Sequence, residues 1–282
     1  MDGLAPSLVV DPGKGVMTGR RFYKMSGSGN DFVIFDSRDG DVAALGEASR
    51  IRRLCDRRQG IGADGIVIVQ PSSSADVLMK YFNSDGSVGA MCGNAALCVT
   101  RLAARLGLAS PSGMTLETDD GILQSRLAGD RPEIELGSVR EVRETAEGPP
   151  EPGERRLGYA IAGVPHVVVL CDAVDSVDVA ARGPALRKAV WTGLAGANVN
   201  FVSPEGSQWA IRTFERGVEA ETLACGTGAV ATATLLKAWG LGGSNTALRT
   251  RSGCTLEVDL SHARPRLRGE GRLVFEGVLG EV

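Results

Sequence analysis

Two stretches of the chain are apolar over the length of a helix and almost free of charge. Residues 92–108 carry only Arg101 and Arg105 as charged positions, and residues 225–241 carry only Lys237. A helix that is apolar almost all round is buried. The pattern therefore predicts a central buried helix in each of two regions, wrapped by other elements.

Short runs that are apolar throughout, or that alternate between apolar and polar residues, predict the strands around these helices. They lie at Asp31–Phe35, Gly65–Val69, Leu78–Phe82, His166–Leu170, Asn198–Val202 and Trp209–Phe214, with a final set between Leu256 and Val278. Residues 51–58 are typical of a peripheral amphipathic helix. Many short strands around one helix in each region predict an α+β fold, with a mostly antiparallel sheet or barrel around each central helix.

The two apolar stretches begin with nearly the same residues, which indicates an internal duplication. Ala90-Met-Cys-Gly-Asn-Ala-Ala-Leu97 opens the first and Leu223-Ala-Cys-Gly-Thr-Gly-Ala-Val230 opens the second, so that Cys225 follows Cys92 by 133 positions. At the same offset Gly107 matches Gly240, and both helices are expected to end there. We therefore predict two pseudo-symmetric halves.

The halves are expected to span residues 21–140 and 158–282, with a C-terminal strand that crosses back to the first half as an option. Residues 141–157 are charged and rich in proline, which predicts a connecting segment. Residues 1–20 are rich in Gly, Pro and Asp and show no periodicity. We expect a disordered leader or an artefact of an upstream start, with Met17 as the alternative start.

Composition favours a globular protein that acts on small molecules. The chain has 282 residues, 43% hydrophobic residues and a net charge of −3, which gives it no basic face for nucleic acid. Apolar runs are shorter than a membrane span, and a signal-peptide layout is absent from the N-terminus. The six cysteines form no C-x-x-C pair, so we predict a cytoplasmic location and no metal site. The oligomeric state stays open, with a homodimer as one option.

Each predicted helix begins directly after a cysteine, Cys92 or Cys225, that is followed by glycine. The first turn of a helix presents free N–H groups and the positive end of the helix dipole, which predicts thiol pKa values lowered from about 8.5 toward neutrality. The same N–H groups can hold an α-carboxylate. Two such thiols on duplicated halves predict an acid and a base on opposite faces of one carbon, the arrangement that inverts a stereocentre.

Polar residues close to the cysteines in sequence are candidates for substrate contacts. Asn83 ends a predicted strand before the first cysteine, and Glu215 and Arg216 end one before the second, where an amide or a guanidinium could orient a carboxylate. The ordinary alternatives are a turn-forming role for Asn83 and a satisfied core position for His166. The cysteines could likewise be small buried hydrophobes, as we expect for Cys55, Cys98, Cys171 and Cys254.

A series of short motifs then indicates a family. They are Lys24-Met-Ser-Gly-Ser-Gly-Asn-Asp-Phe32, Gly60-Ile-Gly-Ala-Asp-Gly65, Phe82-Asn-Ser-Asp-Gly86, Met91-Cys-Gly-Asn94, Gly163-Val-Pro-His166, Ala197-Asn198, Glu215-Arg-Gly217 and Glu221-Thr-Leu-Ala-Cys-Gly-Thr-Gly228. In these motifs the chain, from about Phe22 to its C-terminus, resembles the diaminopimelate epimerases. The resemblance implies an isomerase that works without pyridoxal or another cofactor. It would interconvert LL- and meso-diaminopimelate in lysine and cell-wall precursor synthesis, in a cleft between the halves.

The resemblance also assigns roles to individual residues. Cys92 and Cys225 would be the base and the acid, exchanging roles with the direction of the reaction, while His166 and Glu215 would tune the thiols. The substrate contacts that it implies are Asn30, Asn83, Gly93, Asn94, Asn198, Glu215, Arg216, Gly226 and Thr227.

Three positions depart from the pattern of the family. Ala95 and Leu97 replace a Gly and an Arg in the first cysteine motif, and Val164 stands before Pro-His in place of an Asn. Since these changes bear on the substrate more than on the reaction type, a racemase of proline, hydroxyproline or histidine type stays an alternative. A non-catalytic amino-acid binding protein is a more remote one. An isomerase of the phenazine-biosynthesis type is disfavoured because its members lack the thiol pair.

Overall fold

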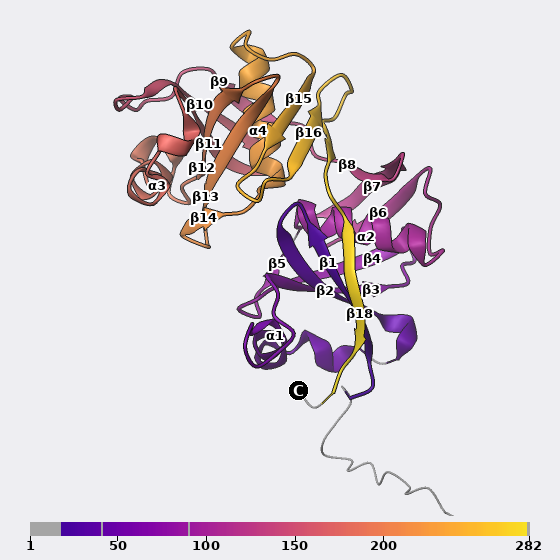
Figure 1. Ribbon diagram of the computed structural model, residues 1–282. Helices are drawn as coiled ribbons and strands as arrows, with labels where there is room; N and C mark the ends of the chain where they lie inside the picture. The colour runs from indigo at the N-terminus through magenta and orange to yellow at the C-terminus, as the bar shows by residue number, and fades with distance from the viewer. Residues whose placement is uncertain (1–17, 41, 90, 281–282) are drawn as a thin grey trace, which may run out of the picture.

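The computed structural model describes residues 18–40, 42–89 and 91–280, so the predicted leader over residues 1–17 lies outside the described residues. The chain forms two lobes in which strands surround one helix each (Figure 1). The helix of the first lobe is α2 (Gly93–Arg105), and that of the second is α4 (Gly226–Ala238). This arrangement confirms the predicted α+β fold with two pseudo-symmetric halves.

The first half begins with β1 and carries α1 on its outer side. Its elements are β1 (Arg21–Gly27), β2 (Asn30–Asp36), η1 (Ser37–Asp39), η2 (Ala43–Gly46), α1 (Ala48–Cys55), β3 (Gly65–Gln70), β4 (Val77–Asn83), β5 (Val88–Gly89), α2, β6 (Met114–Thr118), β7 (Gly121–Ala128) and β8 (Arg131–Glu135).

The second half repeats this order of strands and α-helices after β9 (Arg140–Arg143). Its elements are β10 (Glu154–Ala162), β11 (Val164–Cys171), η3 (Val174–Ser176), α3 (Val179–Arg187), η4 (Val190–Thr192), β12 (Asn198–Glu205), β13 (Gln208–Glu215), β14 (Ala220–Thr222), α4, β15 (Asn245–Arg249), β16 (Thr255–Asp259) and β17 (Arg266–Arg268), followed by β18 (Arg272–Val278).

The strand pairing is the same in the two halves. In the first, β1–β2 and β3–β4 are antiparallel while β2–β3 and β4–β6 are parallel. In the second, β10–β11 and β12–β13 are antiparallel while β11–β12 and β13–β15 are parallel. The repeat in sequence is therefore a repeat of the whole half-sheet.

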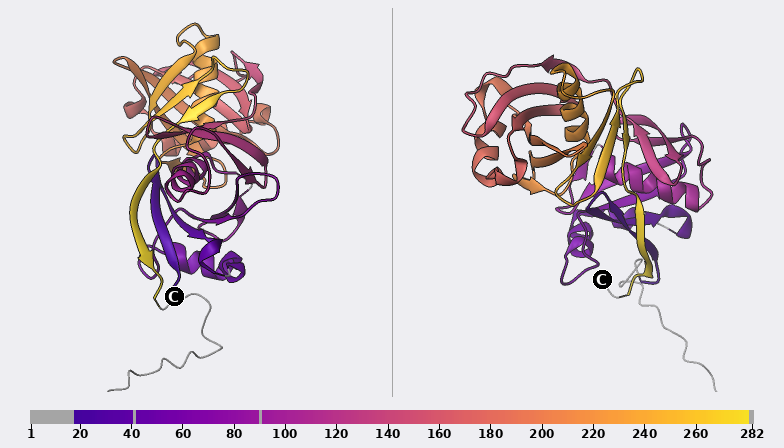
Figure 2. Two further views of the ribbon diagram at one scale, coloured as in Figure 1. Left: turned by 90° about the vertical axis from the view of Figure 1, so that its right-hand side faces the viewer. Right: turned by 45° about the horizontal axis from the view of Figure 1, so that its top comes forward.

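Each half also receives a strand that follows the other half in sequence. After the first half, β9 pairs with β10 of the second, and at the end of the chain β18 pairs with β1 of the first. Figures 1 and 2 show β18, in yellow, running back along the first lobe. Strands β8 and β17 pair directly and join the two half-sheets. The loop predicted over 141–157 is shorter than expected, because strands occupy both of its ends.

The central helices are buried and end as the sequence predicts. Ala95, Leu97 and Leu102 in α2 are at most 1% exposed. Gly107 and Gly240 follow the two helices with positive φ angles of 66° and 73°, a conformation that glycine adopts without strain. Each helix therefore stops at an equivalent glycine.

Two outer helices differ from the sequence prediction. The helix expected over 51–58 is α1, which ends at Cys55 because the Asp56 carboxylate accepts the N–H groups of Arg58 and Gln59 in the turn that follows. Helix α3 was not predicted, since Gly183 and Pro184 interrupt its pattern. Among the described residues, no helix combines the length and apolar character needed to cross a membrane.

Candidate active site

The two cysteines occupy equivalent positions immediately before the central helices. Cys92 is the N-cap residue of α2 and Cys225 that of α4, with nearly identical backbone angles (φ −133° and −135°). A Cβ placed on Gly226 would lie 3.9 Å from the Cα of Gly93 and 2.7 Å from a methyl group of Leu267. The two helix starts therefore adjoin.

Backbone donors surround each sulfur. The Cys225 sulfur accepts the N–H of Gly228 at 3.4 Å and lies 3.5 Å from the Thr227 hydroxyl oxygen. At Cys92, backbone N–H groups of Ala95 and Asn94 favour the thiolate in the same way and lower the thiol pKa. These are the helix-start donors that the sequence predicts.

Both thiols nevertheless have pKa values well above neutrality in this structure. Burial raises the pKa of Cys92 to about 11 and that of Cys225 to about 12, and the negative charge of Glu215 raises both pKa values further. The sequence-based prediction of thiol pKa values near 7 is therefore wrong here, because the loss of hydration outweighs the helix donors. Charge on Cys92 also raises the pKa of Cys225, which places the two sulfurs within electrostatic reach of each other.

Glu215 is the last residue of β13 and lies near both sulfurs. Burial raises the pKa of its carboxyl group, and the nearby charge of Asp64 raises it too. Since the Glu215 charge disfavours both thiolates, its effect is to keep the thiols protonated.

His166 is fully buried on β11 and is held by Asn200. The Asn200 side-chain NH₂ lies 3.2 Å from His166 Nδ1 and also donates to the Val167 carbonyl, while Thr213 donates to Asn200 Oδ1 at 3.0 Å. Nδ1 is therefore the acceptor, and the proton lies on Nε2. Burial lowers the pKa of His166 to about 3, and the charge of Arg216 lowers it as well. The imidazole is neutral and supplies no positive charge to the thiols.

A chain of amides connects the first half to the start of α4. Asn30 donates to the Asp64 carboxylate at 3.0 Å, and Asn94 donates to Asn30 Oδ1 at 2.7 Å. The Asn94 NH₂ also reaches the carbonyl of Ala224 at 3.4 Å, across the junction between the halves. Two of the sequence-predicted contacts, Asn30 and Asn94, are thus fixed against each other beside both cysteines.

The remaining predicted contacts lie at strand ends. Asn198, at the start of β12, accepts the backbone N–H of Arg216 at 2.8 Å, and the Arg216 guanidinium donates to the Gly196 carbonyl at 3.4 Å. Asn83 ends β4 and is hydrogen-bonded by Tyr81 at 2.9 Å. Every site residue of the second half thus lies on or next to β11, β12, β13 or the start of α4.

Three polar residues of this region were not among the sequence candidates: Asp64, Tyr81 and Asn200. Asp64 lies inside one of the motifs that carried the family resemblance, Gly60 to Gly65, so that motif could have revealed it. Tyr81 and Asn200 act through bonds between side chains, which no sequence pattern indicates.

Two of the departures from the family pattern are core positions here. Leu97 is fully buried, and a Cβ placed on Gly269 would lie 2.7 Å from its side chain, so Leu97 packs beneath the segment that leads to β18. Ala95 is also fully buried. Gly228, its equivalent in the second half, lies where a Cβ would come within 2.3 Å of Asn200 Oδ1. The second half thus requires glycine at this position for a reason of its own.

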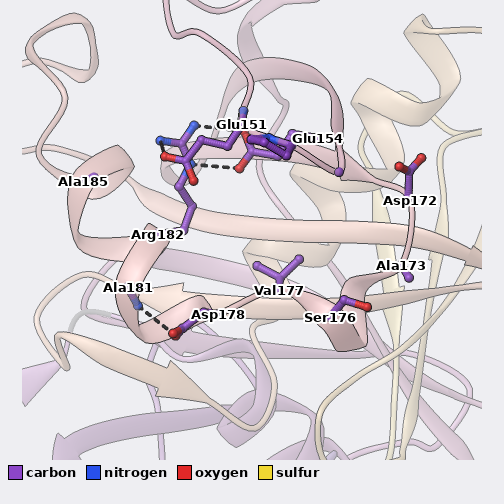
Figure 3. A pocket seen from close by; sticks show the side chains of 12 residues that line it. Glu151, Glu154, Asp172, Ala173, Ser176, Val177, Asp178, Ala181, Arg182 and Ala185 are labelled. Carbon is purple, nitrogen blue, oxygen red and sulfur yellow. Dashed lines mark hydrogen bonds and ion pairs between the residues drawn. The ribbon is translucent and has the colours of Figure 1, made fainter.

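A separate pocket lies on the second half, between α3 and the loop before β10 (Figure 3). Its volume is about 500 Å³, and its charged lining centres on Arg182, which donates to both oxygens of Glu154 at 2.8 and 2.9 Å and also pairs with Glu151. Neither cysteine lines this pocket. Because none of the sequence-predicted site residues lines it, we assign it no part in the site.

Comparison with known proteins decides the family. The profile of the family described as Diaminopimelate epimerase matches two stretches, residues 22–142 and 158–269. The chain belongs to the diaminopimelate epimerase family. This family member is 51% identical over 272 residues to a diaminopimelate epimerase of Gemmatimonas aurantiaca. The aligned region covers 91% of this chain and 98% of the relative. The family resemblance predicted from the motifs is confirmed.

Solved structures show how widely the fold is shared. A phenazine biosynthesis protein of the PhzF family from Bacillus anthracis matches with a TM-score of 0.71 and 14% identity, covering 92% of this chain and 98% of its own. A hydroxyproline epimerase from Agrobacterium vitis matches with a TM-score of 0.68 and 16% identity, covering 92% and 90%. At such identities the likeness concerns the fold alone, so the substrate has to be argued from the site.

Proposed function

We propose that this protein interconverts LL- and meso-2,6-diaminopimelate by a two-thiol mechanism without a cofactor, in lysine and peptidoglycan precursor synthesis. The observation that carries the proposal is the pair of adjoining helix starts, each with a cysteine at its N-cap. Relatives named diaminopimelate epimerase, one of them identical in 51% of aligned residues, support the choice of substrate.

In the proposed reaction, the thiolate of one cysteine removes the proton from the substrate Cα. The electron pair of the broken C–H bond moves into the α-carboxylate, which becomes an enediolate. The opposite cysteine then gives its S–H proton to the other face of the same carbon, so that one thiolate is consumed and one is formed. Backbone N–H groups of Gly93, Asn94, Gly226 and Thr227 stabilise the enediolate through the two helix starts.

High thiol pKa values suit this exchange of protons in one respect. A thiolate with a pKa near 11 is a stronger base toward a carbon acid than one with a pKa near 7, although a smaller fraction of it exists at neutral pH. The charge of Glu215 disfavours both thiolates, and so it keeps the cysteine that donates in its protonated form. We assign Glu215 this role and His166 the role of a neutral hydrogen-bond donor.

The rest of the substrate is proposed to lie against Asn30, Asn83, Asn198 and Arg216. A guanidinium and several amides suit a second polar end, which diaminopimelate has and proline lacks. We place the enzyme in the cytoplasm, which is supported by six cysteines that are all free thiols.

The test is hydrogen exchange in deuterated water. Wild-type protein with LL-diaminopimelate should give meso product with deuterium at one Cα, as read by mass spectrometry. The Cys92→Ala and Cys225→Ala variants should lose this exchange, whereas Cys171→Ala, which removes a buried thiol of the outer core, should keep it.

A panel of proline, 4-hydroxyproline and histidine under the same conditions addresses the alternatives. If one of these amino acids exchanges and diaminopimelate does not, the protein is a racemase of that other amino acid. Binding of diaminopimelate that survives both cysteine substitutions, without any exchange by the wild type, would indicate a binding protein.

A further inference from the structure

The end of β4 presents two polar side chains on one face. Tyr81 and Asn83 are two residues apart on the strand, and residues at i and i+2 point to the same side of a sheet. The Tyr81 hydroxyl donates to Asn83 Oδ1 at 2.9 Å. The oxygen of the Asn83 amide is therefore already occupied by the protein itself.

The nitrogen of the same amide is anchored on its other side. Asn83 Nδ2 donates to the Ser87 hydroxyl oxygen at 2.9 Å, and that hydroxyl donates to the Asp85 carboxylate at 2.6 Å. Turning the amide over would break the bonds to both Tyr81 and Ser87. Since an amide carries two N–H groups, one of them stays available, and what Asn83 can offer to a ligand is a donor.

The Tyr81 ring is seated by two glycines on the flanking strands. A Cβ on Gly65 of β3 would lie 2.6 Å from the ring, and one on Gly89 of β5 would lie 2.5 Å from it. Gly65 is paired with Asn83 and Gly89 with Tyr81 in the sheet. The Phe32 ring packs edge-on at a centroid distance of 6.1 Å. These contacts fix the ring and hence the position of its hydroxyl.

The hydroxyl lies within electrostatic reach of groups from both halves. Burial raises the pKa of Tyr81, and the charges of Cys92 and Glu215 raise it further. Cys92 belongs to the first half and Glu215 to the second. The Tyr81 hydroxyl is therefore near Cys92 and Glu215, and it stays protonated at neutral pH.

We propose that Tyr81 is a positioning residue for substrate recognition: its hydroxyl holds the Asn83 amide with an N–H group free, so that Asn83 selects a hydrogen-bond acceptor such as a carboxylate. The chemical identity of the substrate in this inference rests on the proposed function, whereas the orientation of the amide does not.

The Tyr81→Phe variant removes only the hydroxyl and keeps the seated ring. Once the oxygen of Asn83 is released, the amide can turn and present its oxygen to the substrate. KM for LL-diaminopimelate should rise about 3- to 10-fold, with kcat changed less than about twofold. Tyr23→Phe is the matched control, because the hydroxyl of this buried residue of β1 bonds the exposed Arg21 side chain, and its KM should equal that of the wild type.

A double-mutant cycle separates positioning from a general loss of structure. Asn83→Ala should raise KM, and adding Tyr81→Phe to it should raise KM no further, because the amide that the hydroxyl positions is gone. Increases in KM that multiply in the double variant would overturn the inference, as would a Tyr81→Phe enzyme with unchanged KM.

A measurement on the free protein tests the orientation without any substrate. The side-chain NH₂ signals of Asn83 in a ¹⁵N spectrum can be assigned by their loss in Asn83→Ala. Tyr81→Phe should shift these signals and Tyr23→Phe should leave them in place. If the wild type fails to exchange diaminopimelate, the proposed function fails, and the spectrum still decides the inference: unshifted Asn83 signals in Tyr81→Phe contradict it.

Discussion

At the scale of single residues, each sulfur of the proposed catalytic pair is subject to two opposing effects. Helix-start N–H groups favour the thiolate, and removal from water disfavours it. The outcome is set by magnitude: burial prevails at both cysteines and leaves their pKa values at about 11 and 12. The helix donors are then best regarded as groups for the substrate carboxylate, with a smaller effect on the resting thiols.

The raised pKa values predict how the free enzyme reacts with an alkylating agent. Because thiolate is the reactive form and is scarce below its pKa, iodoacetamide modification of Cys92 and Cys225 should become about tenfold faster with each pH unit from 7 to 9. Peptide mass spectrometry after timed quenching measures each site separately. A rate that levels off below pH 8 at either cysteine would show a thiol pKa near neutrality and contradict the burial argument.

Most of the candidate site residues come from local motifs, and the structure places them around the two helix starts. Cys92 and Cys225 precede apolar helices, and Gly93 and Gly226 follow them directly. The same reasoning did not find Asn200, whose bonds to His166 and Thr213 join residues 34 and 13 positions away. It also misjudged the thiol pKa, since the degree of burial depends on how the two halves pack.

At the scale of elements, the duplication determines more than the two central helices. Helix α1 lies between β2 and β3 of the first half, and α3 lies between β11 and β12 of the second. Shifting α1 by the offset of the cysteines places a helix close to Val179–Arg187. The internal repeat could thus have predicted α3, whose own residues, with Gly183 and Pro184 inside, conceal it.

The start of α4 provides a test of close packing. In Gly228→Ala the new methyl group would meet Asn200 Oδ1 at 2.3 Å, and moving Asn200 would disturb its bonds to His166 and Thr213. We expect a loss of about 1–3 kcal/mol in the free energy of unfolding, measured by urea denaturation. Gly93→Ala is the control, because its methyl group would find neighbours only at 3.6 Å and beyond. Equal stability of the two variants would contradict this packing.

At the scale of the whole molecule, the halves are joined by exchanged strands. β9 pairs with the second half, β18 pairs with the first, and β8 and β17 pair with each other between them. The sequence suggested only the crossing of the last strand, because β9 is short and all four of its residues are exposed and unpatterned. Strand exchange of this kind fixes the relative position of the two cysteines.

Glu133 lies at the junction between the halves. Its carboxylate on β8 accepts Arg268 of β17 at 2.7 Å and Arg126 at 2.8 Å, and its side chain is 4% exposed. Although burial raises its pKa, the two guanidinium groups prevail and the pKa is lowered overall. Glu133→Gln should therefore destabilise the fold by about 1–3 kcal/mol at pH 7.

The pH dependence of this effect has a definite sign. A carboxyl group whose folded pKa is lowered contributes stability above its unfolded pKa, about 4.3, and loses it as the pH falls below that value. The difference between wild type and Glu133→Gln should accordingly shrink below pH 4. Glu141→Gln, which breaks an exposed pair with Arg143, should change little at either pH. A Glu133 effect that is constant from pH 7 to pH 3 would argue against the ion pair.

The central claim is that two thiols act on opposite faces of one carbon, and the early isotope content of substrate and product tests it most directly. LL-diaminopimelate is converted in deuterated water, and the reaction is stopped when the conversion is below about one tenth of its equilibrium value. The two isomers are then separated, and the deuterium content of each is measured by mass spectrometry. The account predicts one deuterium in the meso product and none in the recovered LL substrate, since the donor thiol carries solvent hydrogen and the acceptor thiol takes the substrate proton. Product without deuterium, or deuterium in both isomers from the first turnovers, would mean that a single group handles both faces and would contradict the account.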